Sequence, residues 1–271
     1  MGAELVKKLR AHELTVPTRD PGRLERAGLK AAFPPFPEDL EKLAVETRPE
    51  VIINLLGIIR ETPDAPFRLV HEEYTRRLLA GAKTAGVRKF IQMSALGASA
   101  DSRSGYQRSK FGGEELVRAS GLPFVIFRPS YIAGPGQGLR TDLKRLARFA
   151  PVFAAPCDAL VAPVPVEIVA DCFLRAVEDE GINAETFELA GERVVSFREL
   201  LVSELAAAGL RRPVIGLPRK FFFPLLPVFA LFDPPPMTYE QYLMLASANV
   251  PSGKLRGVND LLAGGSRARV Q

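Results

Sequence analysis

Apolar residues follow two alternating patterns along the first half of the chain, and together these patterns predict the class of fold. Short and nearly continuous apolar runs at residues 51–56, 90–94 and 124–128 are typical of strands buried on both faces of a parallel sheet. Between the first two runs, residues 67–83 place apolar side chains on one face at helical spacing. Strands that alternate with amphipathic helices predict an α/β fold with a doubly wound parallel sheet.

The chain changes character near residue 135, where helices and strands follow one another in mixed order. Helices are expected at residues 139–149, 167–178, 196–208 and 239–246, and short strands at 161–166 and 186–189. Ser196 is expected to cap the helix that follows it. We therefore expect a larger domain at residues 1–134, a smaller mixed lobe at 135–263 and a frayed tail at 264–271.

Composition narrows the class of protein further. The 271 residues carry 36 Lys and Arg against 31 Asp and Glu, and a net charge of +5 is too small for a dedicated nucleic-acid binder. The two cysteines, Cys157 and Cys172, supply no disulfide framework and no metal-type spacing, so we expect no metal site and a reduced intracellular setting. Residues 1–24 lack the apolar core of a secretory signal, so a cytoplasmic location is expected.

Candidate chemistry is concentrated at residues 90–110, whose sequence is FIQMSALGASADSRSGYQRSK. Tyr106 and Lys110 are four positions apart, so on a helix they lie on one face. A nearby ammonium favours the tyrosinate and lowers the pKa of the phenol, which would let Tyr106 exchange a proton near neutral pH. Ser94 ends the preceding apolar run and could place a hydroxyl at the same point. The three side chains fit proton transfer between a carbonyl and an alcohol, provided that a cofactor carries the hydride. The alternative is an exposed Tyr/Lys pair on a solvated helix.

On these motifs the chain resembles the extended or atypical short-chain dehydrogenases/reductases, which are NAD(P)-dependent epimerase/dehydratase-like proteins. The resemblance runs from Gly2 to about Val250 and is carried by Asn54-Leu-Leu-Gly57, Ser94-Ala-Leu-Gly97, Tyr106-x-x-x-Lys110, Arg128-Pro-Ser130 and Pro235-Pro-Met-Thr238. Within this superfamily the chain is similar to the branch that contains the nucleotide-binding accessory subunit of respiratory complex I. The resemblance implies a Rossmann-like fold, a dinucleotide-binding domain at residues 1–134, and hydride transfer from NAD(P)H to a carbonyl.

The resemblance also implies a role for each matching residue. Tyr106 would act as the acid or base, Lys110 would lower the pKa of the phenol and hold the cofactor ribose, and Ser94 would orient the carbonyl. The expected cofactor contacts are Gly2, Arg19, Asn54, Leu55, Gly57, Tyr106, Lys110, Pro129 and Ser130. Arg19 suits the 2′-phosphate of NADP(H), whereas Asp20 beside it would suit the ribose of NAD(H). NADP(H) is favoured over NAD(H).

The N-terminal stretch departs from the pattern of this family. Residues 3–11 predict an amphipathic helix and residues 12–19 a strand, whereas the family begins with a strand and a glycine-rich turn that binds the pyrophosphate. Gly2 matches the last glycine of that turn, and the earlier part is absent. Either the sequence is truncated at its N-terminus, which is the interpretation we favour, or this family member has lost the loop. In both cases we expect weakened dinucleotide binding, because a central strand and the phosphate cradle are missing.

A second unusual stretch lies at residues 220–233 (KFFFPLLPVFALFD), which is apolar, contains two prolines and is too short to span a membrane. Two interpretations stay open: a helix covered by protein, or an interfacial anchor beside Arg219 and Lys220. The second would make the protein membrane-peripheral and supports an alternative function, a non-catalytic accessory or assembly protein of a membrane respiratory complex. His71, within residues 67–83, is interpreted as a structural polar residue rather than a catalyst.

Overall fold

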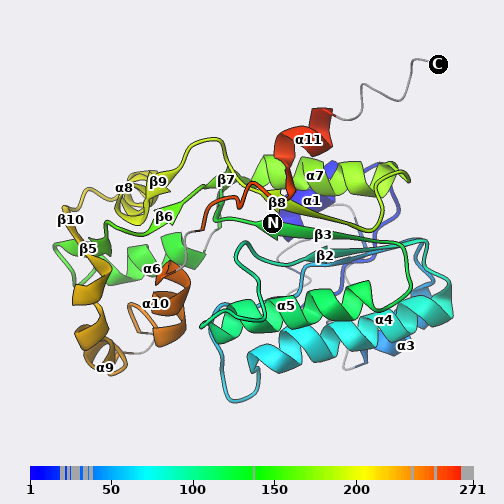
Figure 1. The fold of residues 1–271 in the computed structure, drawn as a ribbon, viewed down its shortest axis with the longest axis horizontal. Helices are drawn as coiled ribbons and strands as arrows, with labels where there is room; N and C mark the ends of the chain where they lie inside the picture. The colour runs from blue at the N-terminus through cyan, green and yellow to red at the C-terminus, as the bar shows by residue number, and fades with distance from the viewer. Residues whose placement is uncertain are drawn as a thin grey trace.

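The centre of the molecule is a five-stranded parallel sheet in the order β1-β2-β3-β8-β11 (Figure 1). Its strands are β1 (Val51–Asn54), β2 (Lys89–Met93), β3 (Phe124–Pro129), β8 (Glu185–Leu189) and β11 (Arg256–Gly257). The structure, a computed structural model, describes residues 1–18, 22, 25, 31–32, 36, 39–136, 138–232, 235–246 and 249–263. The three apolar runs predicted as parallel strands form the adjacent strands β1, β2 and β3.

Helices cover both faces of this sheet. Figure 1 shows α3 (Leu40–Thr47), α4 (Tyr74–Ala85) and α5 (Gly105–Arg118) below it, and α1 (Gly2–Lys8), α7 (Val166–Glu178) and α11 (Val258–Ala263) above it. Successive strand residues point to opposite faces, so Phe90 packs in the core beneath the sheet and Ile91 in the core above it. Both faces bury apolar side chains, which explains the mainly apolar strands, and the predicted doubly wound α/β class is confirmed.

The remaining described segments form small sheets and helices beside the central sheet, on the left of Figure 1. The strand pairs are β4 (Ile132–Ala133) with β7 (Val164–Pro165), β5 (Phe153–Pro156) with β10 (Val214–Leu217), and β6 (Leu160–Val161) with β9 (Val195–Ser196). The helices are α6 (Gly138–Leu146), α8 (Phe197–Ala207), α9 (Leu226–Phe229) and α10 (Tyr239–Ala246). Ser196 caps α8 in a reciprocal capping box with Glu199, as predicted for Ser196. The division of the chain into domains stays a prediction.

Within the strand predicted at residues 12–19, Thr15 and Thr18 are bridge residues, and Thr15 pairs in parallel with Ala32. The Val16 N–H donates to Ala32 O at 2.8 Å, and the Phe36 N–H donates to Thr18 O at 2.8 Å. In the part of the chain that the structure describes, β1 is the edge strand of the central sheet. The helix predicted at residues 67–83 also differs at its start, because it begins with a π-helical turn, η1 (Arg68–Glu73), before α4.

Prolines divide two further segments into short pieces. Pro163 separates β6 from β7, where one strand is predicted. The apolar stretch folds as two 3-10 turns, η2 (Arg219–Phe221) and η3 (Phe223–Leu225), followed by the single turn of α9. Its prolines, Pro224 and Pro227, cannot donate the hydrogen bonds of a longer helix. Among the residues described, no helix has the length and apolar character needed to cross a membrane.

A buried carboxylate joins α5 to the sheet. Glu114 is fully buried, and its two oxygens accept from Arg128 Nε at 2.8 Å and Arg128 Nη2 at 2.6 Å. Arg118 Nη2 donates to the same carboxylate at 2.7 Å. Two guanidinium groups thus neutralise one buried charge at the back of the helix that carries Tyr106.

Candidate active site

The three predicted catalytic residues lie at the carboxyl edge of the sheet. Ser94 directly follows β2, and the connection from β2 leads into α5, which is capped by Ser104 and carries Tyr106 and Lys110. Ser94 is 3%, Tyr106 8% and Lys110 3% exposed. The burial of both α5 side chains excludes the alternative of an exposed pair on a solvated helix. Ligands of open α/β sheets bind at this edge.

Lys110 lies against the ends of two strands. Its Nζ donates to the carbonyl oxygen of Leu56, just after β1, at 3.3 Å and to that of Met93, the last residue of β2, at 3.2 Å. Burial lowers the pKa of Lys110 to about 8, against the nearby carboxylate of Glu114, which raises it. The ammonium therefore keeps its charge at neutral pH and loses it in mildly alkaline solution.

The Tyr106 ring is enclosed by apolar and aromatic neighbours. It packs edge-on against Phe67 and His71, with ring centroids 5.7 Å and 5.5 Å away, and against Ala95. Burial raises the pKa of Tyr106 to about 12. The prediction of a lowered phenol pKa is wrong for this arrangement, because loss of hydration on burial disfavours the tyrosinate. At neutral pH the phenol is protonated and can donate a proton.

Ser94 presents a buried hydroxyl at the same edge. Its backbone N–H donates to Phe127 O at 2.7 Å, which fixes the residue between β2 and β3. Its Oγ is buried and has no hydrogen-bond partner among the described residues. An unsatisfied buried hydroxyl is rare and destabilising, and it is satisfied when a polar ligand atom lies beside it. The observation fits a carbonyl oxygen of a substrate or a polar group of a cofactor.

The residues predicted at the end of β1 have two different roles in the structure. The Asn54 amide donates to Thr75 Oγ1 at 3.1 Å and Gln92 Oε1 at 2.9 Å, and its Oδ1 accepts from Leu56 N at 3.0 Å. Asn54 is thus engaged with the protein and shapes the turn. Gly57 lies at the surface of this turn, where a Cβ atom would stand 2.8 Å from Lys110 Nζ.

The other predicted cofactor contacts differ in their positions and in whether the protein already occupies them. Gly2, at the start of α1, lies beside Leu55, whose Cδ1 is 4.0 Å from the position of a Cβ atom on Gly2. Pro129 ends β3, and Ser130 Oγ donates to Asn249 O at 3.0 Å. Arg19 lies outside the described residues. Gly2, Leu55 and Pro129 therefore lie at strand or helix ends, while the Ser130 hydroxyl is engaged by the backbone at residue 249.

We expect Gly57→Ala to displace the Lys110 ammonium, because the new methyl group would lie well inside van der Waals distance of Nζ. NADPH affinity should fall about tenfold, which corresponds to the loss of one charged hydrogen bond. Gly138→Ala is the matched control, since nothing lies within 4 Å of a Cβ atom there. Fluorescence titration of NADPH checks the result, and equal affinity in the two variants would contradict it.

His71 is a site residue that the sequence analysis assigned to structure alone. It is 1% exposed and its ring stacks on Phe67 at 5.6 Å with an interplanar angle of 12°. Its Nε2 accepts from Ile58 N at 3.1 Å, and its Nδ1 lies 2.8 Å from Ser109 Oγ. A histidine within an amphipathic helical pattern gives no signal of these contacts, since they depend on the π-helical turn.

Helix α10 covers the site from the other side. Glu240 accepts from Ser104 Oγ at 2.9 Å and from Tyr106 N at 3.4 Å, so its carboxylate lies at the N-terminus of α5. Met244, one turn later, packs against the cluster of Phe67, Ala95 and Tyr106. Access to the phenol from this side requires movement of α10. More than 130 residues separate Glu240 from Tyr106, and the sequence holds no signal of this contact.

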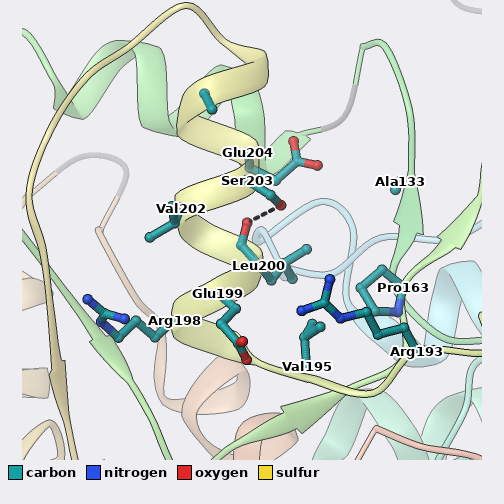
Figure 2. Close-up of a pocket in the computed structure, with 11 residues that line it drawn as sticks. Ala133, Pro163, Arg193, Val195, Arg198, Glu199, Leu200, Val202, Ser203 and Glu204 are labelled. Atoms are coloured by element: carbon teal, nitrogen blue, oxygen red, sulfur yellow. Dashed lines mark hydrogen bonds between the residues drawn. The ribbon is translucent and has the colours of Figure 1, made fainter.

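Two surface cavities of about 470 Å³ each lie elsewhere, and neither includes Ser94, Tyr106 or Lys110. Figure 2 shows the first, in which Ser203 and Glu204 on α8 stand opposite Arg193 and Pro163. Two of its polar side chains are already engaged, since Ser203 Oγ donates to Leu200 O at 2.8 Å and Glu204 accepts from Arg140 Nε at 2.9 Å. The candidate active site is the buried set of Ser94, Tyr106 and Lys110.

Known proteins share this sequence pattern and architecture. Residues 1–179 match the model of a family described as NAD(P)H-binding. The mitochondrial NADH dehydrogenase (ubiquinone) 1 alpha subcomplex subunit 9 of Arabidopsis thaliana is 31% identical over 173 residues, which cover 62% of this chain and 42% of that protein. A ceramide reductase of Caulobacter vibrioides is 37% identical over 116 residues, which cover 43% of this chain and 36% of that protein. The chain thus spans less than half the length of these relatives.

A solved structure shows the same fold at lower identity. UDP-glucuronic acid 4-epimerase from Bacillus cereus, in complex with NAD, has a TM-score of 0.66 at 18% identity, over 80% of this chain and 84% of that chain. The predicted resemblance to short-chain dehydrogenase/reductase-like proteins, and to the complex I subunit among them, is confirmed by these comparisons. Because the family model covers well over half of its residues, the chain belongs to the NAD(P)H-binding family.

Proposed function

We propose that the protein reduces a carbonyl compound at the carboxyl edge of β1, β2 and β3. The bound nicotinamide dinucleotide supplies the hydride. The observation that carries the proposal is the burial of three polar side chains at this edge: the unpartnered Ser94 hydroxyl, the protonated Tyr106 phenol and the Lys110 ammonium. The match to an NAD(P)H-binding family and the similarity to a ceramide reductase support it.

Each side chain has a role in this proposal. Ser94 donates a hydrogen bond to the carbonyl oxygen and so fixes its position. Tyr106 gives its proton to the same oxygen as negative charge develops there, and its raised pKa keeps that proton on the phenol at neutral pH until then. Lys110 stabilises the developing anion and attracts the anionic dinucleotide for as long as it keeps its own proton.

The preference for NADP(H) and a weakened affinity form part of the proposal. Arg19 in the sequence suits a 2′-phosphate. The weaker affinity is supported by the edge position of β1 in the described part of the sheet, since dinucleotides of this fold are held beside a central strand. Parallel titrations with NADPH and NADH test the first point through the ratio of the two dissociation constants.

The reductase proposal is tested by incubating the protein with NADPH and a panel of aldehydes and ketones. The proposal expects one alcohol formed for each NADPH oxidised with at least one member of the panel. Binding of NADPH by a folded protein, with no turnover across the panel, would instead favour the second candidate below.

The second candidate is a non-catalytic accessory protein that binds NADPH and docks on a membrane complex or membrane surface. Its support is an exposed apolar surface formed by the large side chains of residues 221–232: Phe221, Phe223, Leu225, Val228, Leu231 and Phe232. From residue 211 to residue 232 the sequence contains four arginines or lysines and no acidic residue. Apolar side chains flanked by basic ones suit an anionic lipid surface. The Arabidopsis relative is named as a subunit of the mitochondrial NADH dehydrogenase (ubiquinone).

For this candidate we expect the protein to sediment with vesicles that contain phosphatidylglycerol and less with pure phosphatidylcholine. The double substitution of Phe223 and Leu231 by serine should weaken binding at least about tenfold, because each buried apolar side chain contributes about 1.5–3 kcal/mol. Phe149→Ser is the control, since Phe149 is at least as exposed as Phe223 and Leu231 but lies outside this surface. Equal sedimentation of the wild type and the double variant would contradict the docking role.

A further inference from the structure

The buried imidazole ring of His71 contacts two parts of the candidate site, the turn after β1 and the start of α5. The Nε2 atom of His71 accepts from the N–H of Ile58, which follows Gly57 in the turn after β1. The carbonyl group of Leu56 in the same turn accepts from Lys110. Through Nε2, His71 therefore fixes the segment that holds the lysine.

The opposite side of the ring reaches the first turn of α5. The Nδ1 atom of His71 lies 2.8 Å from Ser109 Oγ, and that hydroxyl donates to Tyr106 O at 2.8 Å. The ring edge also packs on the Tyr106 phenol. His71 thus contacts Tyr106, the proposed proton donor, in two ways. Ser109 links it to the Tyr106 backbone, and its ring packs on the Tyr106 side chain.

The hydrogen bonds define the state of the imidazole. The Ile58 N–H points at Nε2, so Nε2 carries no proton. The single hydrogen of the Ser109 hydroxyl is used by Tyr106 O, so Nδ1 must donate to Ser109 Oγ. His71 is therefore neutral and protonated on Nδ1. Burial, and then the charge of Lys110, lower the pKa of His71 to about 3, so this state persists across the neutral range.

Two backbone features fix the position of His71: a π-helical turn and the close approach of a glycine of α5. His71 lies in the π-helical turn η1, a geometry that recurs at functional sites. Gly113 of α5 packs on this turn so closely that a Cβ atom would stand 2.6 Å from His71 O. The close approach explains a glycine in the middle of α5, where it lowers the stability of the helix.

We infer that His71 is a positioning residue, which holds the Leu56–Ile58 turn and the first turn of α5 in register so that Lys110 and Tyr106 face one bound dinucleotide. This inference rests on the proposed binding of the dinucleotide at this edge. A histidine that serves packing alone would affect stability without a specific effect on NADPH affinity, and this difference separates the two roles.

The test compares His71→Leu, His71→Asn and Val70→Ala by NADPH titration and by thermal unfolding. Leucine fills space but offers no hydrogen bonds, so NADPH affinity should fall about tenfold, whereas asparagine supplies one donor and one acceptor and should restore most of it. Val70 is a buried neighbour on the same turn, and Val70→Ala reports the effect of lost stability alone. Equal affinity in His71→Leu and Val70→Ala overturns the inference. A wild-type protein that binds no NADPH overturns both this inference and the proposed function.

A second measurement needs no nucleotide. The protein has two histidines, so a His12→Gln variant leaves His71 as the only imidazole in a nitrogen-15 spectrum. The inference predicts a neutral ring protonated on Nδ1 at neutral pH. A ring protonated on Nε2, or on both nitrogens, would break the bond from Ile58 and overturn the inference.

Discussion

Replacing Tyr106 by phenylalanine is expected to lower the turnover number for carbonyl reduction by about 10²–10⁴-fold, the usual contribution of a positioned general acid. The substitution removes one oxygen and leaves the ring to pack against Phe67 and His71. NADPH affinity and thermal stability should change little. Steady-state kinetics with NADPH and the substrate found in the panel measure the effect.

Tyr239→Phe is the control for this prediction, because Tyr239 is exposed and lies on the helix that covers the site. Its turnover should equal that of the wild type. If Tyr106→Phe keeps full turnover, the phenol is not the proton donor and the reductase proposal loses its acid. If neither protein turns over any carbonyl while both bind NADPH, the accessory role is favoured.

Glu114→Ala is expected to destabilise the fold by about 3–5 kcal/mol, the usual result of breaking a buried ion pair from one side. The substitution leaves the guanidinium of Arg128, whose side chain is 15% exposed, without its carboxylate partner. It also removes one partner of Arg118, which keeps its contact with Glu115. Urea unfolding measures the loss. Glu115→Ala, at an exposed carboxylate one position along, should cost less than about 1 kcal/mol. A similarly small loss of stability in Glu114→Ala would contradict the role assigned to the buried charge cluster of Glu114, Arg118 and Arg128.

The strands and layers of the central domain could be predicted because burial on both faces leaves a direct signature. Residues in the strands β1, β2 and β3 alternate between two cores, so most of their positions are apolar. The helices between them have one apolar face. Pro163 falls inside the strand predicted at residues 161–166 and separates it into β6 and β7, because a proline cannot donate to a strand ladder.

The candidate site remains a prediction in its members, and its electrostatics differ from the expectation. Spacing predicted that Tyr106 and Lys110 share a helix face, and the end of an apolar run placed Ser94 near them. The pKa of Tyr106 depends on whether burial or the lysine dominates, and the sequence does not report burial at one position. The π-helical turn at His71 and the contact of Glu240 with α5 arise from tertiary packing between distant segments. Neither leaves a local pattern.

The central claim is that Lys110 and its neighbours form a dinucleotide site, and NADPH titration of the wild type and Lys110→Met tests it most directly. We predict saturable binding by the wild type at about pH 7, and weaker binding at about pH 9, where Lys110 has lost its proton. Lys110→Met should bind at least about tenfold more weakly at the lower pH. Folded proteins with equal affinity, or a wild type without saturable binding, would contradict the account.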